Sequence, residues 1–156
     1  MTYIKSKSPR KKIIDKIPTT KGEKKKAWDK FSIFIRMRDC IKTTGTFVRG
    51  RCYTCDRVYD FKDLQAGHFV PGRGNAVLFD EHGVKAQCLQ CNFYRGGEPL
   101  LFRKKLIIEY GVRLVELLEN KRYQTQKYTM SDYQILRRFY IAKTEQLKKF
   151  NAKEKK

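Results

Sequence analysis

Apolar residues recur at spacings of three and four over residues 24–43, and this periodicity predicts a helix that buries one face. Gly45 lies just beyond this stretch and is suited to end the helix in the left-handed conformation. The predicted buried face consists of Ala27, Phe31, Phe34 and Ile35, widened by Trp28, Met37 and Ile41.

The same periodicity predicts helices in the last third of the chain. A helix is expected over residues 99–110, where Pro99 suits the first position and Gly111 ends the pattern. A second is expected over residues 112–120. Residues 131–134 have the pattern of a capping box, which predicts that a last helix opens at Ser131.

Residues 46–92 contain only short apolar runs separated by turn-forming residues. We expect strand-like pieces at residues 47–48 and 58–59 and a helical turn within residues 60–65. A hairpin is expected with arms at residues 69–70 and 77–79. The prediction is therefore an α+β fold in which a small zinc-stapled core is flanked by N-terminal and C-terminal helices.

These patterns divide the chain into an arm and one domain. Residues 1–21 are basic and poor in apolar side chains, so we expect a flexible arm. Residues 22–156 are expected to form a single domain. Its parts are a leading helix over 22–45, the zinc core over 46–100, and a helical region over 101–156.

The strong positive charge of the chain favours a nucleic-acid-binding protein over a generic small domain. The 156 residues include 36 Lys and Arg against 16 Asp and Glu, a formal net charge of +20. A polyanion would offset this self-repulsion, although a merely basic surface is the alternative. Neither a membrane-spanning run nor a secretory signal is visible, so a cytoplasmic location is expected. The residues expected to contact phosphates are Lys24, Lys25, Lys26, Arg36, Arg73, Arg95, Arg137 and Arg138.

Four of the five cysteines form two Cys-x-x-Cys pairs, Cys52 with Cys55 and Cys88 with Cys91. Such pairs in a chain without a secretion signal predict one tetrahedral Zn²⁺ held by four thiolates. A redox pair is the alternative, but no thioredoxin-like pattern surrounds either motif. Cys40 stands apart, and we interpret it as a small buried thiol rather than a fifth ligand.

His68 and Asn92 are the candidate catalytic residues. His68 lies between the cysteine pairs and can take a proton from water, although an isolated histidine is more often structural. Asn92 follows the second pair, where its amide oxygen can bind Mg²⁺ or Mn²⁺ or can cap a helix. The other histidine, His82, lies in a polar turn and could contact a cation together with Asp80 or Glu81.

The motifs resemble those of the phage NinG family, which includes a recombination endonuclease of lambdoid phages. The resemblance covers residues 24–120 and also extends, less closely, to His-Asn-His nucleases with a ββα-metal core. The segments that carry it are Cys52-x-x-Cys55, Leu64-Gln65-Ala66-Gly67-His68-Phe69, residues 75–81 and Gln87-Cys88-x-x-Cys91-Asn92.

The resemblance implies a metal-dependent DNA endonuclease that cuts branched recombination intermediates such as D-loops and Holliday-type junctions. It implies that His68 is the general base, that Asn92 binds a catalytic Mg²⁺ or Mn²⁺, and that Zn²⁺ pins the hairpin. Many such nucleases have an acidic cation ligand where this chain has Gly67. The missing ligand would then come from water or from Asp80, Glu81, His82 or Glu98.

Two other functions stay open at this point. One is a non-catalytic zinc-ribbon adaptor that binds nucleic acid, and the other is a sequence-specific nuclease of restriction or homing type. Expected partners are branched DNA and phage or host recombination proteins. A homodimer would suit symmetric cutting of a junction.

Overall fold

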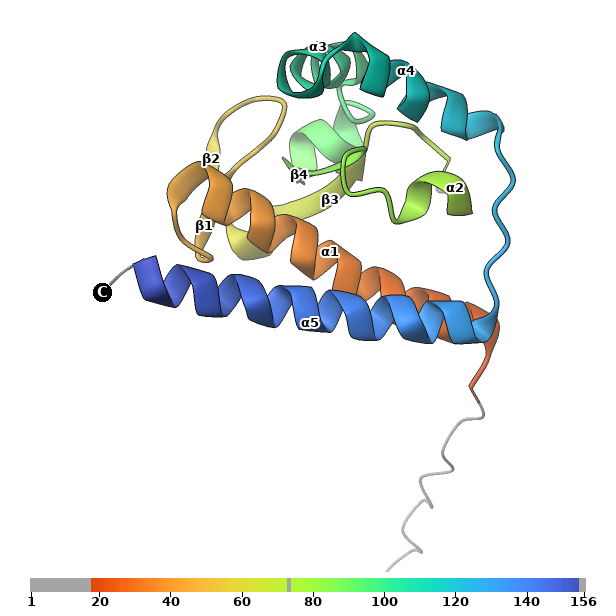
Figure 1. Ribbon diagram of the computed structural model, residues 1–156. Helices are drawn as coiled ribbons and strands as arrows, with labels where there is room; N and C mark the ends of the chain where they lie inside the picture. Colours follow the sequence, from red (N-terminus) through yellow and green to blue (C-terminus); the bar gives the residue numbers. More distant parts are fainter. Residues whose placement is uncertain (1–17, 73, 155–156) are drawn as a thin grey trace, which may run out of the picture.

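The computed structural model describes residues 18–72 and 74–154 (Figure 1). Over these residues the fold is α+β, as expected, with two small antiparallel sheets of two strands each. The α-helices are α1 (Thr20–Thr44), α2 (Asn75–Leu78), α3 (Pro99–Tyr110), α4 (Val112–Asn120) and α5 (Met130–Glu154). The strands are β1 (Arg49–Arg51), β2 (Val58–Asp60), β3 (Leu64–His68) and β4 (Val84–Cys88), and the short helical turns are η1 (Phe61–Asp63), η2 (Gln90–Tyr94) and η3 (Lys121–Tyr123).

The long helix α1 is capped at both ends by the residues that flank it. The Thr19 hydroxyl accepts a hydrogen bond from the Gly22 N–H at 3.1 Å, so the helix begins four residues earlier than expected. At the other end Gly45 adopts φ 69° and donates its N–H to the Ile41 carbonyl. The remainder of the predicted arm, residues 1–17, lies outside the described residues.

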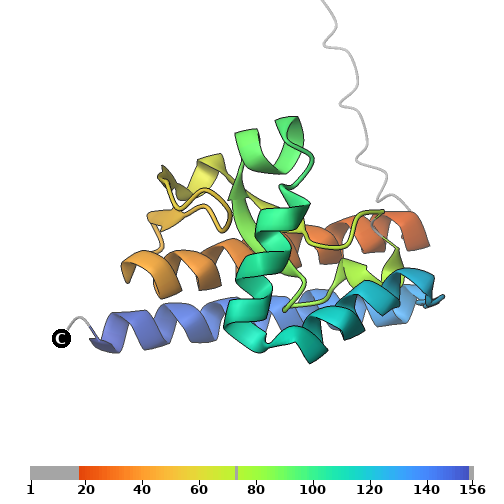
Figure 2. The ribbon, with the colours of Figure 1, turned by 90° about the horizontal axis from the view of Figure 1, so that it is seen from above.

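Helices α1 and α5 lie side by side and run in the same direction, which is visible in both ribbon views (Figures 1 and 2). Their C-terminal ends are joined by a 2.9 Å hydrogen bond from the Asn151 side chain to the Gly45 carbonyl. Phe31, Phe34 and Tyr140 pack between them, together with Val84 of β4. This layer supports one side of the central β3–β4 hairpin.

A second helical layer covers the other side of the hairpin. Helices α3 and α4 occur where the sequence predicts them, and Gly111 between them adopts φ 82°. A buried cluster joins both helices to the segment after β3. Its members are Phe69, Val70, Val77, Phe102, Leu106, Val115 and Leu118.

The central hairpin differs from the predicted one. Strands β3 and β4 pair from Leu64↔Cys88 to His68↔Val84, whereas the predicted arms at residues 69–70 and 77–79 are not strands. Phe69 and Val70 are buried loop residues, and residues 75–78 form the single helical turn α2. Runs of two or three apolar residues are too short for periodicity to distinguish strand from helix, which explains the error.

Two further boundaries are corrected. The strand predicted at residues 47–48 instead begins at Arg49, where β1 pairs with β2. The cap of α5 lies at Thr129 rather than Ser131, because Thr129 and Asp132 exchange hydrogen bonds between their side chains and backbone N–H groups. No helix within residues 18–72 and 74–154 is long and apolar enough to cross a bilayer.

Candidate metal centre and neighbouring cleft

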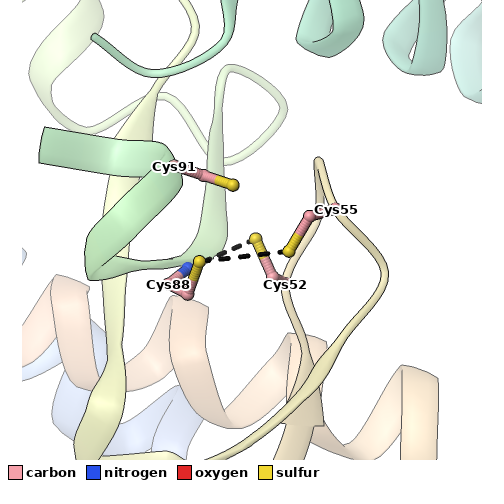
Figure 3. A group of neighbouring side chains, drawn as sticks. All are labelled: Cys52, Cys55, Cys88 and Cys91. Atoms are coloured by element: carbon pink, nitrogen blue, oxygen red, sulfur yellow. Dashed lines mark hydrogen bonds between the residues drawn. The ribbon is translucent and has the colours of Figure 1, made fainter. Parts of the chain in front are cut away.

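Four cysteine sulfurs meet where the β1–β2 loop faces the end of β4. Cys52 and Cys55 lie on this loop, Cys88 ends β4 and Cys91 lies on η2, with the side chains directed toward one another (Figure 3). The sulfurs all lie within 4.8 Å of one another. Tetrahedral zinc with Zn–S bonds of about 2.3 Å needs sulfurs about 3.8 Å apart, so the cluster fits a Cys₄ site.

The surroundings of the cluster favour a thiolate at Cys52. Burial raises the pKa of this thiol, but hydrogen bonds from Cys55, Thr54 and Cys88 outweigh burial and lower the pKa to about 7. The Cys88 N–H donates to Cys52 Sγ at 3.3 Å. At Cys91, burial raises the pKa to about 12, so a bound cation would be needed to deprotonate this thiol.

Cys40 is separate from the cluster. It is fully buried with Leu64 and Ala86, and burial raises its pKa to about 11. The interpretation of Cys40 as a small buried thiol is therefore confirmed.

A cleft of about 640 Å³ opens beside β3, and His68 and Asn92 both line it. His68 is the last residue of β3, and its ring stacks on Trp28 of α1 with centroids 5.0 Å apart. His68 Nε2 lies 3.2 Å from the Leu78 carbonyl oxygen. Because a carbonyl oxygen only accepts, Nε2 of the neutral ring carries the hydrogen, and Nδ1 carries the basic lone pair.

The side chain of Asn92 has a fixed orientation at the edge of this cleft. It projects from η2, and its Nδ2 donates to Gln65 Oε1 at 2.7 Å. Its Oδ1 lies 2.8 Å from the position that a Cβ on Gly67 would occupy. The two candidate catalytic residues, which are 24 positions apart in the sequence, therefore share one cleft.

The acidic residues expected as further cation ligands do not line this cleft. Burial would raise the pKa of Asp80, but Lys121 and the N–H groups of His82 and Gly83 hold it below its usual value. Glu81 pairs with Lys143 at 2.6 Å.

The two remaining candidates are also engaged elsewhere. Glu98 pairs with Arg95 at 3.1 Å. The ring of His82 lies edge-on to Tyr110, with ring centroids 5.1 Å apart. Neither Glu98 nor His82 lines the cleft that holds His68.

Arg36 and Lys62 add positive charge to the cleft. The Arg36 guanidinium donates to the Phe61 and Leu64 carbonyl oxygens and lies 4.4 Å from the Phe61 ring, so this residue also fixes the start of β3. Its structural contacts were not foreseen from the sequence.

The other predicted phosphate contacts among the described residues lie on α1, on α5 and, for Arg95, directly after η2. Lys25 and Arg138 are exposed, as is Arg95 despite its ion pair. Three more are engaged within the protein: Lys24 with Asn75, Lys26 with Glu23, and Arg137 with Glu23. Arg73 lies outside the described residues.

A family model described as bacteriophage lambda NinG protein matches residues 5–151. The chain belongs to the NinG family. The resemblance drawn from the motifs is thus confirmed, and the match spans every residue of the NinG cysteine cluster and cleft. No curated protein and no solved structure matched the chain significantly.

Sequence reasoning missed Trp28 and Gln65, which line the NinG cleft, and the fully buried Gln87, whose amide oxygen lies next to Gly67. Trp28 was assigned only to a buried helix face, and Gln65 and Gln87 were given no role. The two glutamines lie directly opposite each other in the β3–β4 register. Correct placement of these strands would have brought them together, but the apolar pattern placed the strands elsewhere.

Proposed function

We propose that this protein is a metal-dependent DNA endonuclease that hydrolyses phosphodiester bonds in branched recombination intermediates. The observation that carries the proposal is the shared cleft of His68 and Asn92, bordered by Arg36 and Lys62. The antiparallel pair of β3 and β4, with α2 in the loop between them and the short helical turn η2 after them, supports the proposed resemblance to a ββα-metal core. Membership of a phage family supports a role in phage recombination.

His68 is proposed to be the general base. The Leu78 carbonyl and the Trp28 ring hold the imidazole so that Nδ1 can accept a proton from the attacking water. Imidazole is the side chain best suited to this transfer near neutral pH.

Asn92 is proposed to bind the catalytic divalent cation through Oδ1. Amide oxygens are hard ligands that suit Mg²⁺ or Mn²⁺, and the fully buried Gln87 has an Oε1 without a hydrogen-bond partner among the described residues. The residues near Asn92 therefore fit a hard cation. When bound, this cation would stabilise negative charge on the phosphate oxygens during hydrolysis.

Two exposed aromatic side chains support a preference for branched DNA. Phe93 and Tyr94 follow Asn92 on η2 and are 71% and 67% exposed. Aromatic rings stack on bases that are not held in a duplex, and such bases occur where strands exchange. The formal charge of +20 would hold the flanking phosphates without reading sequence.

The test compares a four-way junction with a matched linear duplex, with and without Mg²⁺, for the zinc-loaded wild type and His68→Ala. The nuclease proposal expects Mg²⁺-dependent cleavage of the junction that is lost in His68→Ala while binding is retained. Equal binding with no cleavage by either protein would instead identify the zinc-ribbon adaptor. Discrete bands from a linear plasmid would identify a sequence-specific nuclease.

A further inference from the structure

The side chain of Gln87 has a fixed orientation in the protein interior. Gln87 is fully buried on β4, and its Nε2 donates to the Gly97 carbonyl at 2.9 Å and to Thr54 Oγ1 at 3.2 Å. Because the Gly97 carbonyl only accepts, the amide nitrogen must face it. The amide oxygen therefore points the other way, where the described residues offer it no hydrogen bond.

This oxygen occupies the space that a side chain at position 67 would need. A Cβ on Gly67 would lie 2.0 Å from Gln87 Oε1 and 2.8 Å from Asn92 Oδ1. Any residue other than glycine would therefore displace Gln87. The absence of a side chain at Gly67 allows the neighbouring strand to place an oxygen beside that of Asn92.

The two oxygens are directed to one place by matching contacts. Gln65 Oε1 accepts from Asn92 Nδ2, just as the Gly97 carbonyl accepts from Gln87 Nε2. In both amides the nitrogen donates a hydrogen bond and the oxygen faces Gly67. A buried amide oxygen that accepts no hydrogen bond from the described residues is energetically costly.

We propose that Gln87 Oε1 and Asn92 Oδ1 are the paired protein ligands of the catalytic divalent cation. Gln87 would supply from β4 the oxygen that Gly67 cannot. This inference rests on the proposed function. It also supplies a ligand in place of the acidic candidates, because Asp80, Glu81 and Glu98 are held in ion pairs away from the cleft. Two neutral ligands bind a hard cation weakly, so DNA phosphate and water would complete its coordination.

The test measures Mn²⁺ binding to the zinc-loaded full chain from the paramagnetic resonance signal of free Mn²⁺. Mn²⁺ is hard and weakly bound by thiolates, so it leaves the Zn²⁺ in place. Gln87→Glu replaces the neutral oxygen with a carboxylate, and the matched control Gln90→Glu adds the same charge at an exposed position on η2. We expect Gln87→Glu to tighten Mn²⁺ binding about tenfold or more, and Gln90→Glu to leave it unchanged.

If Gln87 has only a structural role, Gln87→Glu should not tighten Mn²⁺ binding. Gln87→Glu loses the hydrogen bond to the Gly97 carbonyl, so unchanged or weaker Mn²⁺ binding would overturn the inference. Gln87→Met keeps the volume without the oxygen and decides the question if Gln87→Glu does not fold. It should weaken Mn²⁺ binding about tenfold at unchanged zinc content.

Asn92→Ala separates this inference from the proposed function. If Asn92→Ala abolishes Mn²⁺ binding and both Gln87 variants bind Mn²⁺ like the wild type, the inference fails and the proposed cation site at Asn92 stands. If the wild type neither binds Mn²⁺ nor cleaves a junction, both fail.

Discussion

The cysteine cluster and the cleft are adjacent sites with opposite properties. Cys91 and Asn92 are neighbours on η2, yet one joins a cluster of sulfurs and the other lines a cleft of about 640 Å³. The cluster offers soft ligands and, once four-coordinate, no open position. The cleft offers nitrogen and oxygen atoms beside space for a substrate. One short turn therefore connects a site suited to stability with a site suited to chemistry.

The two sites also differ in how they are assembled. Each cysteine pair places two thiols three positions apart in the sequence, so each pair can chelate a metal ion locally. The cleft takes Trp28 from α1, His68 from β3 and Asn92 from η2, and it exists only when these elements are in place. We therefore expect damage to spread from the cluster to the cleft but not in the reverse direction.

Loss of the cysteine cluster should have the largest effect. Cys88→Ser breaks the cluster, and structural zinc contributes about 10–16 kcal/mol of apparent binding energy in small domains. In this larger protein we expect several kcal/mol of lost unfolding free energy, measured by guanidinium titration. Trp28 is the only tryptophan and stacks on His68, so its fluorescence should report the collapse of the cleft in the same experiment.

Cys40→Ala is the matched control for this prediction. It removes a buried thiol outside the cluster, so zinc content should be unchanged and stability should fall by only about 1 kcal/mol. If Cys88→Ser retained wild-type stability and Trp28 fluorescence, the proposed dependence of the cleft on the cluster would be wrong.

Substitution of His68, the proposed base, should slow cleavage without destabilising the fold. His68→Ala should lower the rate of Mg²⁺-dependent junction cleavage by about 10²–10⁴-fold, the usual contribution of a general base. Zinc content and junction affinity should stay at wild-type levels. The control is His82→Ala, which changes the chain's other histidine outside the cleft and should cleave normally. Equal losses in both variants would contradict the role assigned to His68.

The contrast between the two sites also explains what the sequence could predict. The cysteine cluster and helices α3 and α4 were predicted because their signals are local: ligand spacing, apolar periodicity, and a proline and a glycine at helix ends. Membership of the NinG family was visible for the same reason, since its motifs are short and contiguous.

The inner surroundings of the cleft could not be predicted in this way. Gln87 and Gly67 interact only through the β3–β4 register, and that hairpin was placed wrongly because its apolar runs are short. Trp28 is 40 positions from His68, and nothing in the local pattern indicates that their rings stack. Contacts set by tertiary packing leave no periodic trace in a single sequence.

Phe93 and Tyr94, the exposed aromatic pair on η2, should have a smaller effect than His68. They should act on the selectivity for branched DNA rather than on the cleavage rate. Phe93→Ala with Tyr94→Ala should reduce the preference for a four-way junction over a linear duplex by about 1–3 kcal/mol for each base that is no longer stacked. Equilibrium binding to the two DNAs measures this. Tyr123→Ala, an 80% exposed aromatic residue on η3, is the control and should keep the preference. A junction preference that survives the double substitution would assign selectivity to another surface.

The smallest expected effect is acid sensitivity that originates at Glu109, on the cluster's side of the protein. Glu109, Lys85 and Cys52 line a common cavity of about 370 Å³. Burial would raise the pKa of Glu109, but hydrogen bonds from Lys42, Tyr110 and Lys85 outweigh it and hold the pKa at about 2. A lowered folded-state pKa stabilises the protein above the ordinary value of 4.5, and this stabilisation is lost as pH falls from about 4.5 to about 2.

Glu109→Gln removes this titration and isolates its contribution. Zinc release in acid is common to both proteins, so the difference between their unfolding free energies reports Glu109 alone. Because the side chain is 19% exposed, we expect the wild type to lose about 1–2 kcal/mol more than Glu109→Gln as pH falls through this window. Parallel stability curves would show that the Lys85–Glu109 pair contributes nothing through ionisation. Acid would then act on the fold through other groups, such as the Asp80 carboxyl and the cysteine cluster.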